Sequence, residues 1–290
     1  MNIVSFGTDS EFLVYEKETG KFIPAYRFIK GTKEEPQHIG SFLYGDLYVH
    51  WDNVALEVTA TPLEYGGDII TPHAMSTYLS EVYQQVQSWM DSHCPELLLT
   101  FRPVVEIDEE TMFEREANIF GCEPDYNVWT LQQNPSPSPM KAGKLRTAGA
   151  HLHFGLQPSS DDNIIALLKL LDKTAADLSP HLGRESLKKE YQRRSLYGMA
   201  GSFRRKEYGV ESRVFSPVIF NKLATFAALL SHNFRYKHCV DSAVKFEDID
   251  LLVNGNGSKY FEIKHKQARL DEIKMTDNHT ILSLLQQELQ

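Results

Sequence analysis

Apolar and polar residues alternate along several short stretches of the chain, a period of two that is typical of strands with one buried face. These stretches cover residues 2–15, 54–62, 97–107 and 146–156. Elsewhere apolar residues recur at the spacing of a helix that packs by one side. These segments cover residues 71–92, 160–171, 186–194 and 219–237, and Ser160 is the expected N-cap of the second. The pattern therefore predicts helices packed by one face on a sheet.

Two polar stretches rich in Gly and Pro, residues 30–40 and 133–145, are expected to be loops. The second runs directly into the extended run 146–156, which carries two histidines. A loop in that position is a candidate lid over whatever those histidines bind, and a plain surface linker is the alternative. No repeat and no long linker divides the chain, so we expect a single domain over residues 1–290. Residues 241–290 have a weaker pattern and form a C-terminal extension.

Composition places the chain among ordinary soluble proteins, with 42% hydrophobic and 24% charged residues. A formal net charge of -9 argues against a surface that binds duplex nucleic acid. The N-terminus lacks the features of a signal peptide, and no apolar run is long enough to span a membrane. Cys94, Cys122 and Cys239 are widely separated, which fits a reducing compartment. We therefore expect a cytoplasmic protein with neither nucleic-acid nor membrane partners.

Four predicted strands each present chemically active side chains two residues apart, and so on one face. The pairs are Asp9 with Glu11, Glu57 with Thr59, His151 with His153, and Glu211 with Arg213. If these strands are neighbours in an antiparallel sheet, their polar faces form a cup of carboxylates and imidazoles rimmed by arginines. Such a cup suits two or three magnesium ions, because hard cations take oxygen ligands. The alternatives are solvated acidic faces, structural histidines and a surface hairpin held by salt bridges.

The sequence offers no phosphate-binding loop of the Gly-x-x-x-x-Gly-Lys-Ser/Thr type and no Gly-x-Ser-x-Gly nucleophile elbow. A nucleotide would therefore have to bind through the sheet and its metal ions. Arg204 and Arg205 shortly precede Glu211. Guanidinium groups clustered beside acids are one way in which a site holds a polyphosphate.

Four segments together resemble the phage-associated COOH-NH2 ligase type 2 family of the glutamine synthetase superfamily, which also contains the glutamate–cysteine ligases. They are GTDSEF at residues 7–12, GCEPDY at 121–126, RTAGAHLH at 146–153 and YGVESR at 208–213. The resemblance implies an α+β fold with a glutamine-synthetase-like catalytic domain, in which helices pack on the outer face of a curved, mainly antiparallel sheet. It also implies an ATP-dependent ligase that joins a carboxylate to an amine through an acyl-phosphate. The acid is expected to be an amino acid or a peptide.

The resemblance assigns roles to individual residues. The metal-ligand positions are matched by Asp9, Glu11, Glu57, His151 and Glu211. The positions near the nucleotide phosphates are matched by His153, Arg204 and Arg205, and those near the acid substrate by Arg146, Gly149 and Arg213. Arg213 and Arg204 are the expected catalytic residues. The implied cofactors are ATP and Mg²⁺, with Mn²⁺ as a substitute, and the implied location is the host cytoplasm if a phage encodes the protein. Relatives that complete their sites between subunits suggest a homo-oligomer.

Two other functions are compatible with the same residues. A metal-dependent amide hydrolase also uses a His-x-His pair with acids to activate water. A non-catalytic protein with the same fold could act as a nucleotide sensor or an assembly component. Metal-stimulated ADP release that requires both an acid and an amine would separate the ligase from these alternatives.

Overall fold

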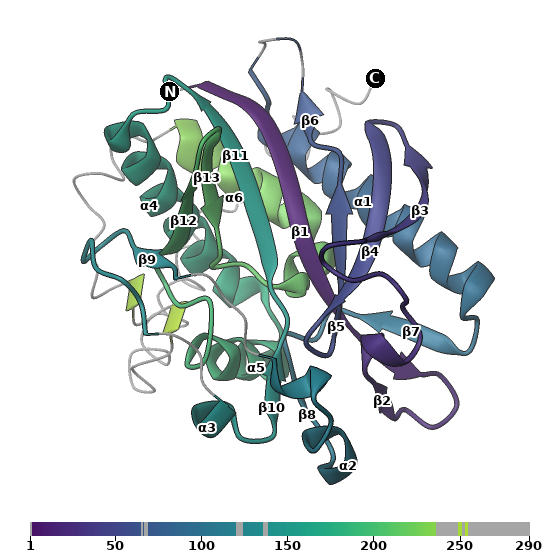
Figure 1. Ribbon diagram of the computed structural model, residues 1–290. Helices are drawn as coiled ribbons and strands as arrows, with labels where there is room; N and C mark the ends of the chain where they lie inside the picture. The colour runs from purple at the N-terminus through teal and green to yellow at the C-terminus, as the bar shows by residue number, and fades with distance from the viewer. Residues whose placement is uncertain are drawn as a thin grey trace.

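The longest strand of the protein, β1 (Asn2–Glu16), lies at the centre of a large antiparallel sheet in the computed structural model (Figure 1). The structure describes residues 2–64, 66, 69–119, 124–135, 139–235, 249–250 and 253–254. Along the sheet the strands follow the order β3, β4, β5, β1, β11, β13, β12 and β9, and β2, β6 and β7 also pair with β1. The remaining strands, β8 and β10, form a separate antiparallel pair.

The other strands have the following bounds: β2 (Phe22–Ile23), β3 (Gln37–Phe42), β4 (Gly45–Asp52), β5 (Ala55–Ala60), β6 (Leu63–Glu64), β7 (Leu97–Thr100), β8 (Val104–Glu106), β9 (Tyr126–Asn127), β10 (Leu145–Thr147), β11 (Ala150–Gln157), β12 (Ser202–Lys206) and β13 (Gly209–Ser212). The helices are α1 (Pro72–His93), α2 (Glu109–Met112), α3 (Pro139–Ala142), α4 (Asp161–Leu178), α5 (Arg184–Arg194) and α6 (Leu223–Arg235). Short 3₁₀ helices are η1 (Ala25–Arg27), η2 (Glu116–Asn118), η3 (Ser179–His181) and η4 (Pro217–Lys222).

The period of two along β1 separates a core face from a polar face. Phe6, Phe12 and Val14 are fully buried in the main hydrophobic core. The ring of Phe6 meets that of Tyr78 in α1 edge-on, with centroids 5.6 Å apart. Since side chains alternate along a strand, Asp9 and Glu11 lie on the opposite face, away from the helices.

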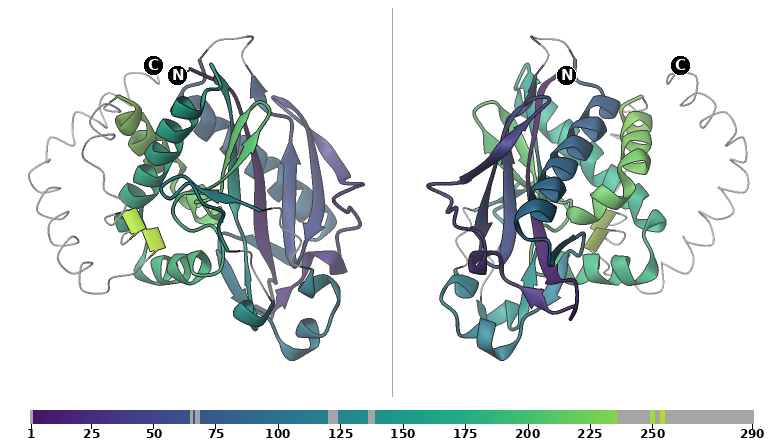
Figure 2. Two further views of the ribbon diagram at one scale, coloured as in Figure 1. Left: turned by 60° about the vertical axis from the view of Figure 1, so that its left-hand side comes forward. Right: turned by 90° about the vertical axis from the view of Figure 1, so that its right-hand side faces the viewer.

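Helices α1, α4 and α6 cover one face of the sheet, so the predicted packing of helices on a mainly antiparallel sheet is confirmed (Figure 2). The side chain of Thr71 accepts a hydrogen bond from the amide of Ala74 at the start of α1. Ser160 does the same for Asn163 at the start of α4, as the sequence predicted. Among the described residues, no helix combines the length and apolar character needed to cross a bilayer.

Several predicted boundaries were wrong because pairing partners change along the chain. The predicted loop 30–40 contains the start of β3, which is stabilised by pairing with β4. The predicted strand 97–107 is broken after Thr100, since β7 pairs with β1 while β8 pairs with β10. The run 146–156 is likewise divided between β10 and β11, and the predicted helix 219–237 begins as the 3₁₀ helix η4.

The predicted loop 133–145 includes the short helix α3 and leads into β10 rather than directly into the histidine strand β11. Its residues 136–138 lie outside the described residues, and its role as a lid stays a prediction. Residues 121–123 of the GCEPDY segment also lie outside the described residues, as does nearly all of 241–290.

Candidate functional site

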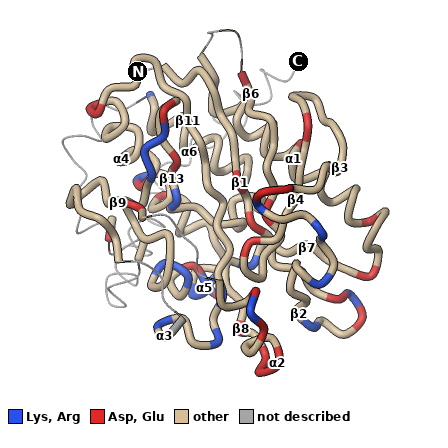
Figure 3. The backbone as a smooth tube through the Cα atoms, in the orientation of Figure 1, with Lys and Arg blue, Asp and Glu red and all other residues tan. Residues whose placement is uncertain are grey.

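The strands that carry the predicted pairs are consecutive in the sheet, in the order β5, β1, β11, β13 and β12. Their register sets Glu11 opposite Glu57, Asp9 opposite His151, and Glu211 opposite both His153 and Arg204. The predicted meeting of distant acidic, imidazole and guanidinium side chains on one face is therefore present in the structure. Acidic positions gather around β1 and β4, and basic positions lie beyond β11 near β13 (Figure 3).

Three carboxylates form an acidic cluster on this face: Glu11 on β1, Asp52 on β4 and Glu57 on β5. One oxygen from each lies within 4.8 Å of the others. Burial raises the pKa of Glu11 to about 7, and the charge of Asp52 acts in the same direction. Burial also raises the pKa of Glu57 well above its usual range, and Glu11 adds to this effect. The side chain of Glu57 is itself buried.

The acidic cluster has the donor set of a divalent-cation site. Hard cations such as Mg²⁺ and Mn²⁺ prefer carboxylate oxygens, and a bound cation would remove the repulsion that raises these pKa values. His50 lies beside the cluster, with Nε2 3.6 Å from a carboxylate oxygen of Glu57. Both ring nitrogens of His50 are buried without a hydrogen bond among the described residues. Burial lowers the pKa of His50, which leaves a neutral imidazole available as a further ligand.

The backbone of Gly149 fixes the position of Glu11. Its amide donates a hydrogen bond to Oε2 of Glu11 at 2.6 Å, and its carbonyl accepts one from the Glu11 amide at 2.8 Å. A Cβ atom on Gly149 would lie 2.6 Å from Nε2 of His151, closer than real Cβ contacts. Glycine is therefore needed for close packing here. The sequence predicted Gly149 near the acid substrate, and the structure places it against an acidic side chain.

A basic group of Arg204, Lys206 and Arg213 surrounds Glu211. Nη1 of Arg204 and Nζ of Lys206 lie 3.6 and 3.1 Å from its carboxylate oxygens, and Arg213 donates a short hydrogen bond to it. Glu211 is almost fully buried, so these cations are its principal compensation. The carboxylate of Glu211 thus lies outside the acidic cluster, although the family resemblance assigned it to the metal ligands.

Tyr197 holds two predicted site residues in place. Its hydroxyl lies 3.2 Å from Nε2 of His151, and its ring lies 4.7 Å below the guanidinium carbon of Arg213. Nδ1 of His151 lies 3.8 Å from Glu211. Burial, with the positive charge of Arg213, lowers the pKa of His151 well below its usual range. His151 is therefore a neutral imidazole between an acid and a phenol, a form that can accept a proton or bind a metal.

His153 links Asp9 to Tyr208. Its Nε2 lies 3.1 Å from a carboxylate oxygen of Asp9, and its Nδ1 lies 2.5 Å from the hydroxyl of Tyr208. Burial acts to raise the pKa of Asp9, but the hydrogen bond and charge of His153 outweigh it, so the pKa lies below the usual value. In this structure Asp9 is paired with an imidazole rather than with the acidic cluster.

Two predicted residues are not brought into the site. Arg205 lies opposite Val210 in the β-ladder and pairs with Asp161 at the start of α4, because neighbouring residues of β12 point to opposite faces. Arg146 is buried and donates to the carbonyls of Ala117 at 2.7 Å and Gly143 at 2.8 Å. Its guanidinium therefore ties the β10 segment to η2, and its substrate role stays a prediction.

Sequence reasoning missed several residues of this face. They are His50, Asp52, Asp125, Tyr197, Lys206 and Tyr208. His50 and Asp52 are again two residues apart on one strand, so the signal that identified the other pairs was present in β4. Asp125 lies 3.6 Å from Nε of Arg213, a contact that no local pattern indicates.

Fold and site together define a mixed helix and sheet protein in which a cluster of buried acids lies on the same sheet face as a group of basic side chains. Residues 140–267 match the model of the phage phiEco32-like COOH.NH2 ligase-type 2 family. The match confirms the resemblance that the motifs indicated and supports a carboxylate–amine ligase in general. It includes β11, β12 and β13, whereas the acidic cluster precedes the matched region. No curated protein matches the chain.

Proposed function

We propose that the protein is an ATP-dependent carboxylate–amine ligase of the glutamine-synthetase-like fold, acting on the carboxylate of an amino acid or a peptide through an acyl-phosphate. The observation that carries the proposal is the acidic cluster of Glu11, Asp52 and Glu57, which lies on the same sheet face as the basic group around Glu211. Phosphoryl transfer needs this combination, since its catalysis is mainly positioning and neutralisation of charge.

In the proposed reaction a carboxylate oxygen attacks the γ-phosphorus of ATP, and the bond to the leaving ADP breaks. The amine then attacks the carbonyl carbon, loses a proton and expels phosphate, which leaves an amide. Mg²⁺ or Mn²⁺ held by Glu11, Asp52 and Glu57 would neutralise charge on the phosphate oxygens. No side-chain nucleophile takes part.

The chain's own cations supply the remaining positive charge. Arg213 is held rigidly by Glu211, Asp125 and the ring of Tyr197, so its planar fork is already oriented. Arg204 and Lys206 lie farther along the same hairpin, and anionic phosphates would compete with Glu211 for them. His153 lies between these groups and Asp9, where it can donate to a phosphate oxygen.

The test is a substrate screen with the full chain, ATP and Mg²⁺. Amino acids and short peptides are paired with ammonia or primary amines, ADP release is followed, and the amide is identified by mass spectrometry. We expect ADP release to depend on both the acid and the amine. Amide cleavage without ATP would instead indicate the metal-dependent hydrolase, and ATP binding without turnover in any pair would indicate a non-catalytic protein.

A substitution tests the role of the guanidinium once a substrate pair is known. Arg213→Lys keeps the charge but loses the planar fork, so we expect kcat/KM to fall about 100-fold. The matched control is Arg184→Lys at the exposed start of α5, which should leave kcat/KM unchanged. Equal activity of Arg213→Lys and the wild type would show that the site needs only charge there.

A further inference from the structure

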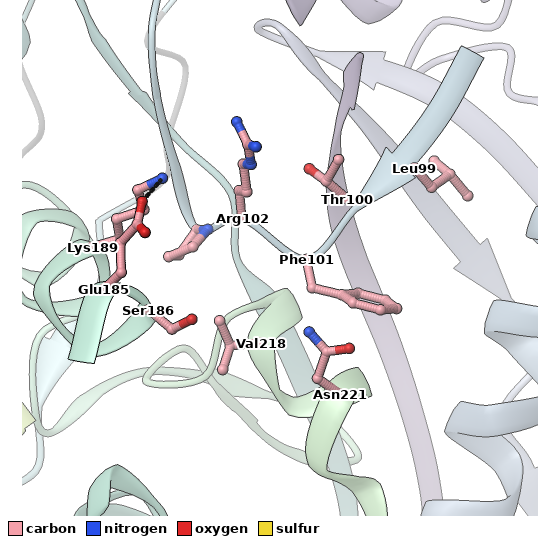
Figure 4. A pocket seen from close by; sticks show the side chains of 10 residues that line it. Leu99, Thr100, Phe101, Arg102, Glu185, Ser186, Lys189, Val218 and Asn221 are labelled. Atoms are coloured by element: carbon pink, nitrogen blue, oxygen red, sulfur yellow. Dashed lines mark ion pairs between the residues drawn. The ribbon is translucent and has the colours of Figure 1, made fainter. Parts of the chain in front are cut away.

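A pocket of about 400 Å³ lies between the connection from β7 to β8, the first turns of α5, and η4 (Figure 4). None of its lining residues belongs to the acidic cluster or the basic group. The guanidinium carbon of Arg102 lies 4.4 Å from the centre of the Tyr15 ring, and in Figure 4 this side chain points away from Ser186 and Asn221. A nucleotide bound by the two charged groups would therefore extend along the sheet face and not into this pocket.

The hairpin of β12 and β13 sets out the basic side chains along one line of the sheet face. Arg213 directly follows β13 at one end of the hairpin, and Tyr208 lies in the turn at the other end. Arg204 and Lys206 lie between them on β12, on the same face as Glu211. Because a strand rises about 3.4 Å per residue, the turn and Arg213 are about 15 Å apart. An extended nucleoside triphosphate covers a distance of this size.

Exposure to solvent increases along this line towards the turn. Arg213 is 1% exposed, whereas Tyr208 is 46% exposed. The side chains of Arg204 and Lys206, which lie between them, are 14% and 30% exposed. The transferred phosphoryl group belongs at the buried end, where water is excluded. The part of the nucleotide that does not react would then lie at the open end, beside Tyr208.

Tyr208 is held both by its backbone and by its hydroxyl. Its carbonyl accepts a hydrogen bond at 3.1 Å from the amide of Leu156, and its hydroxyl lies 2.5 Å from Nδ1 of His153. The Tyr208 and His153 rings have centroids 6.1 Å apart and are tilted by 45°, so the imidazole does not stack flat on the phenol. A partly exposed aromatic ring in a fixed orientation is a preorganised surface for stacking.

We propose that the ring of Tyr208 stacks on the adenine of ATP, with the phosphates running along the hairpin past Lys206 and Arg204 to Arg213. This proposal rests on the proposed function and adds a subsite for the base. Stacking on an aromatic side chain suits any nucleobase, because each base has a π face. Tyr208 supplies that surface at the open end of a line of cations, which is the arrangement that a nucleotide complements.

The test is isothermal titration calorimetry of the full chain with Mg²⁺, in the absence of any acid or amine. ATP is compared with inorganic tripolyphosphate, which has the chain of phosphates but no base. We expect ATP to bind the wild type at least about tenfold more tightly than tripolyphosphate, because only ATP can stack.

Two substitutions of Tyr208 separate its ring from its hydroxyl. Tyr208→Ser removes the ring, so ATP affinity should fall about tenfold or more, whereas tripolyphosphate affinity should not change. Tyr208→Phe loses the hydroxyl contact with His153 but keeps the ring, and it should retain most of the ATP affinity.

The matched control is Tyr126→Ser. Tyr126 is also 46% exposed, but it lies opposite Phe203, whose side chain is on the other face of β12 from Arg204. Its loss should leave both affinities unchanged.

The base subsite and the proposed function fail in different ways. Equal affinities of the wild type for ATP and tripolyphosphate would overturn the subsite and leave the ligase proposal intact. The subsite is also overturned if Tyr208→Ser keeps wild-type ATP affinity, or if it weakens ATP and tripolyphosphate alike. Absence of binding for both probes would overturn the ATP-dependent ligase and the subsite together.

Discussion

Single side chains set the chemistry of the polar sheet face, and the acidic cluster is the clearest case. Glu11, Asp52 and Glu57 are brought within 4.8 Å of one another although no arginine or lysine forms an ion pair with them among the described residues. Mutual repulsion and burial then favour protonation unless a cation binds. Three buried carboxylates of this kind would repel one another less with a bound cation than without one.

Asp52→Asn tests this cluster at the one of its three carboxylates that was not among the predicted site residues. Removing one charged ligand should weaken Mn²⁺ binding about tenfold, since oxygen-ligand sites tune affinity by the number of charges. Mn²⁺ titration followed by electron paramagnetic resonance measures the Kd. Asp46→Asn, on the same strand but outside the cluster, should bind Mn²⁺ like the wild type. Equal affinities for the two variants would contradict the cluster.

Asp172 offers a separate test that depends on pH. It is buried in α4 and accepts a hydrogen bond from Nε1 of Trp129 at 2.5 Å. Burial raises its pKa to about 7, so the folded state holds this proton more tightly than the unfolded chain does. As pH rises from about 4 to about 7, Asp172 ionises more readily in the unfolded chain than in the folded protein. The free energy of unfolding therefore falls over this range.

Asp172→Asn removes this titration. Relative to the wild type, the free energy of unfolding of the variant should rise by about 1–3 kcal/mol between about pH 4 and pH 8. Urea denaturation across that range measures the difference. Parallel curves for the two proteins would show that the carboxyl titrates alike in the folded and unfolded states.

At the scale of single elements, the connections between strands position site residues. The Ala148–Gly149 connection between β10 and β11 is one such segment, because it passes from the small sheet to the large one beside Glu11. The backbone amide of Gly149 holds the carboxylate of Glu11. Because Gly149 has no side chain, the ring of His151 can pack closely against it. The connection between β10 of the small sheet and β11 of the large sheet therefore positions Glu11, which belongs to a third strand, β1.

Gly149→Ala should lower the free energy of unfolding by about 1–3 kcal/mol, because the added methyl group overpacks a tight site. It should also weaken Mn²⁺ binding by displacing Glu11. Gly7→Ala is the matched control in β1, where the nearest atom to an added Cβ would be 3.6 Å away. That control should change stability by no more than about 0.5 kcal/mol. Similar losses for both variants would argue against a special role for Gly149.

The whole molecule carries a formal net charge of -9, and part of that charge is concentrated in one buried cluster. Folding therefore works against repulsion both over the surface and inside the site. A divalent cation that binds the folded state alone would offset this cost by mass action. The proposed metal site therefore predicts that Mn²⁺ stabilises the fold.

Mn²⁺ at about 100 times its Kd should raise the free energy of unfolding by about 2.7 kcal/mol. Thermal and urea denaturation with MnCl₂, against NaCl at equal ionic strength, measure the effect. The gain should be smaller in Asp52→Asn at the same Mn²⁺ concentration. A stabilisation that NaCl reproduces would show charge screening rather than a site.

Local pattern predicted most of the fold because hydrophobic periodicity reports which face of an element is buried. It predicted the strand around Asp9 and Glu11 and a helix over 71–92, which the structure has at 72–93. The position of Ser160 directly before a helical pattern predicted the cap of α4. The same periodicity placed His151 with His153 on one face, and the motifs indicated the family whose model matches residues 140–267. These features depend on residues close together in the chain.

The tertiary structure decided which faces meet. Pairing of β4 with β5 and of β5 with β1 brought Asp52 beside Glu11. Arg146, on the β10 strand that pairs with β8, instead donates a hydrogen bond to the carbonyl of Ala117. Arg204 and Arg205 are neighbours in sequence, yet the sheet gives the first to Glu211 and the second to Asp161. Strand pairing depends on contacts between residues far apart in the chain, and a local pattern contains no information about such partners.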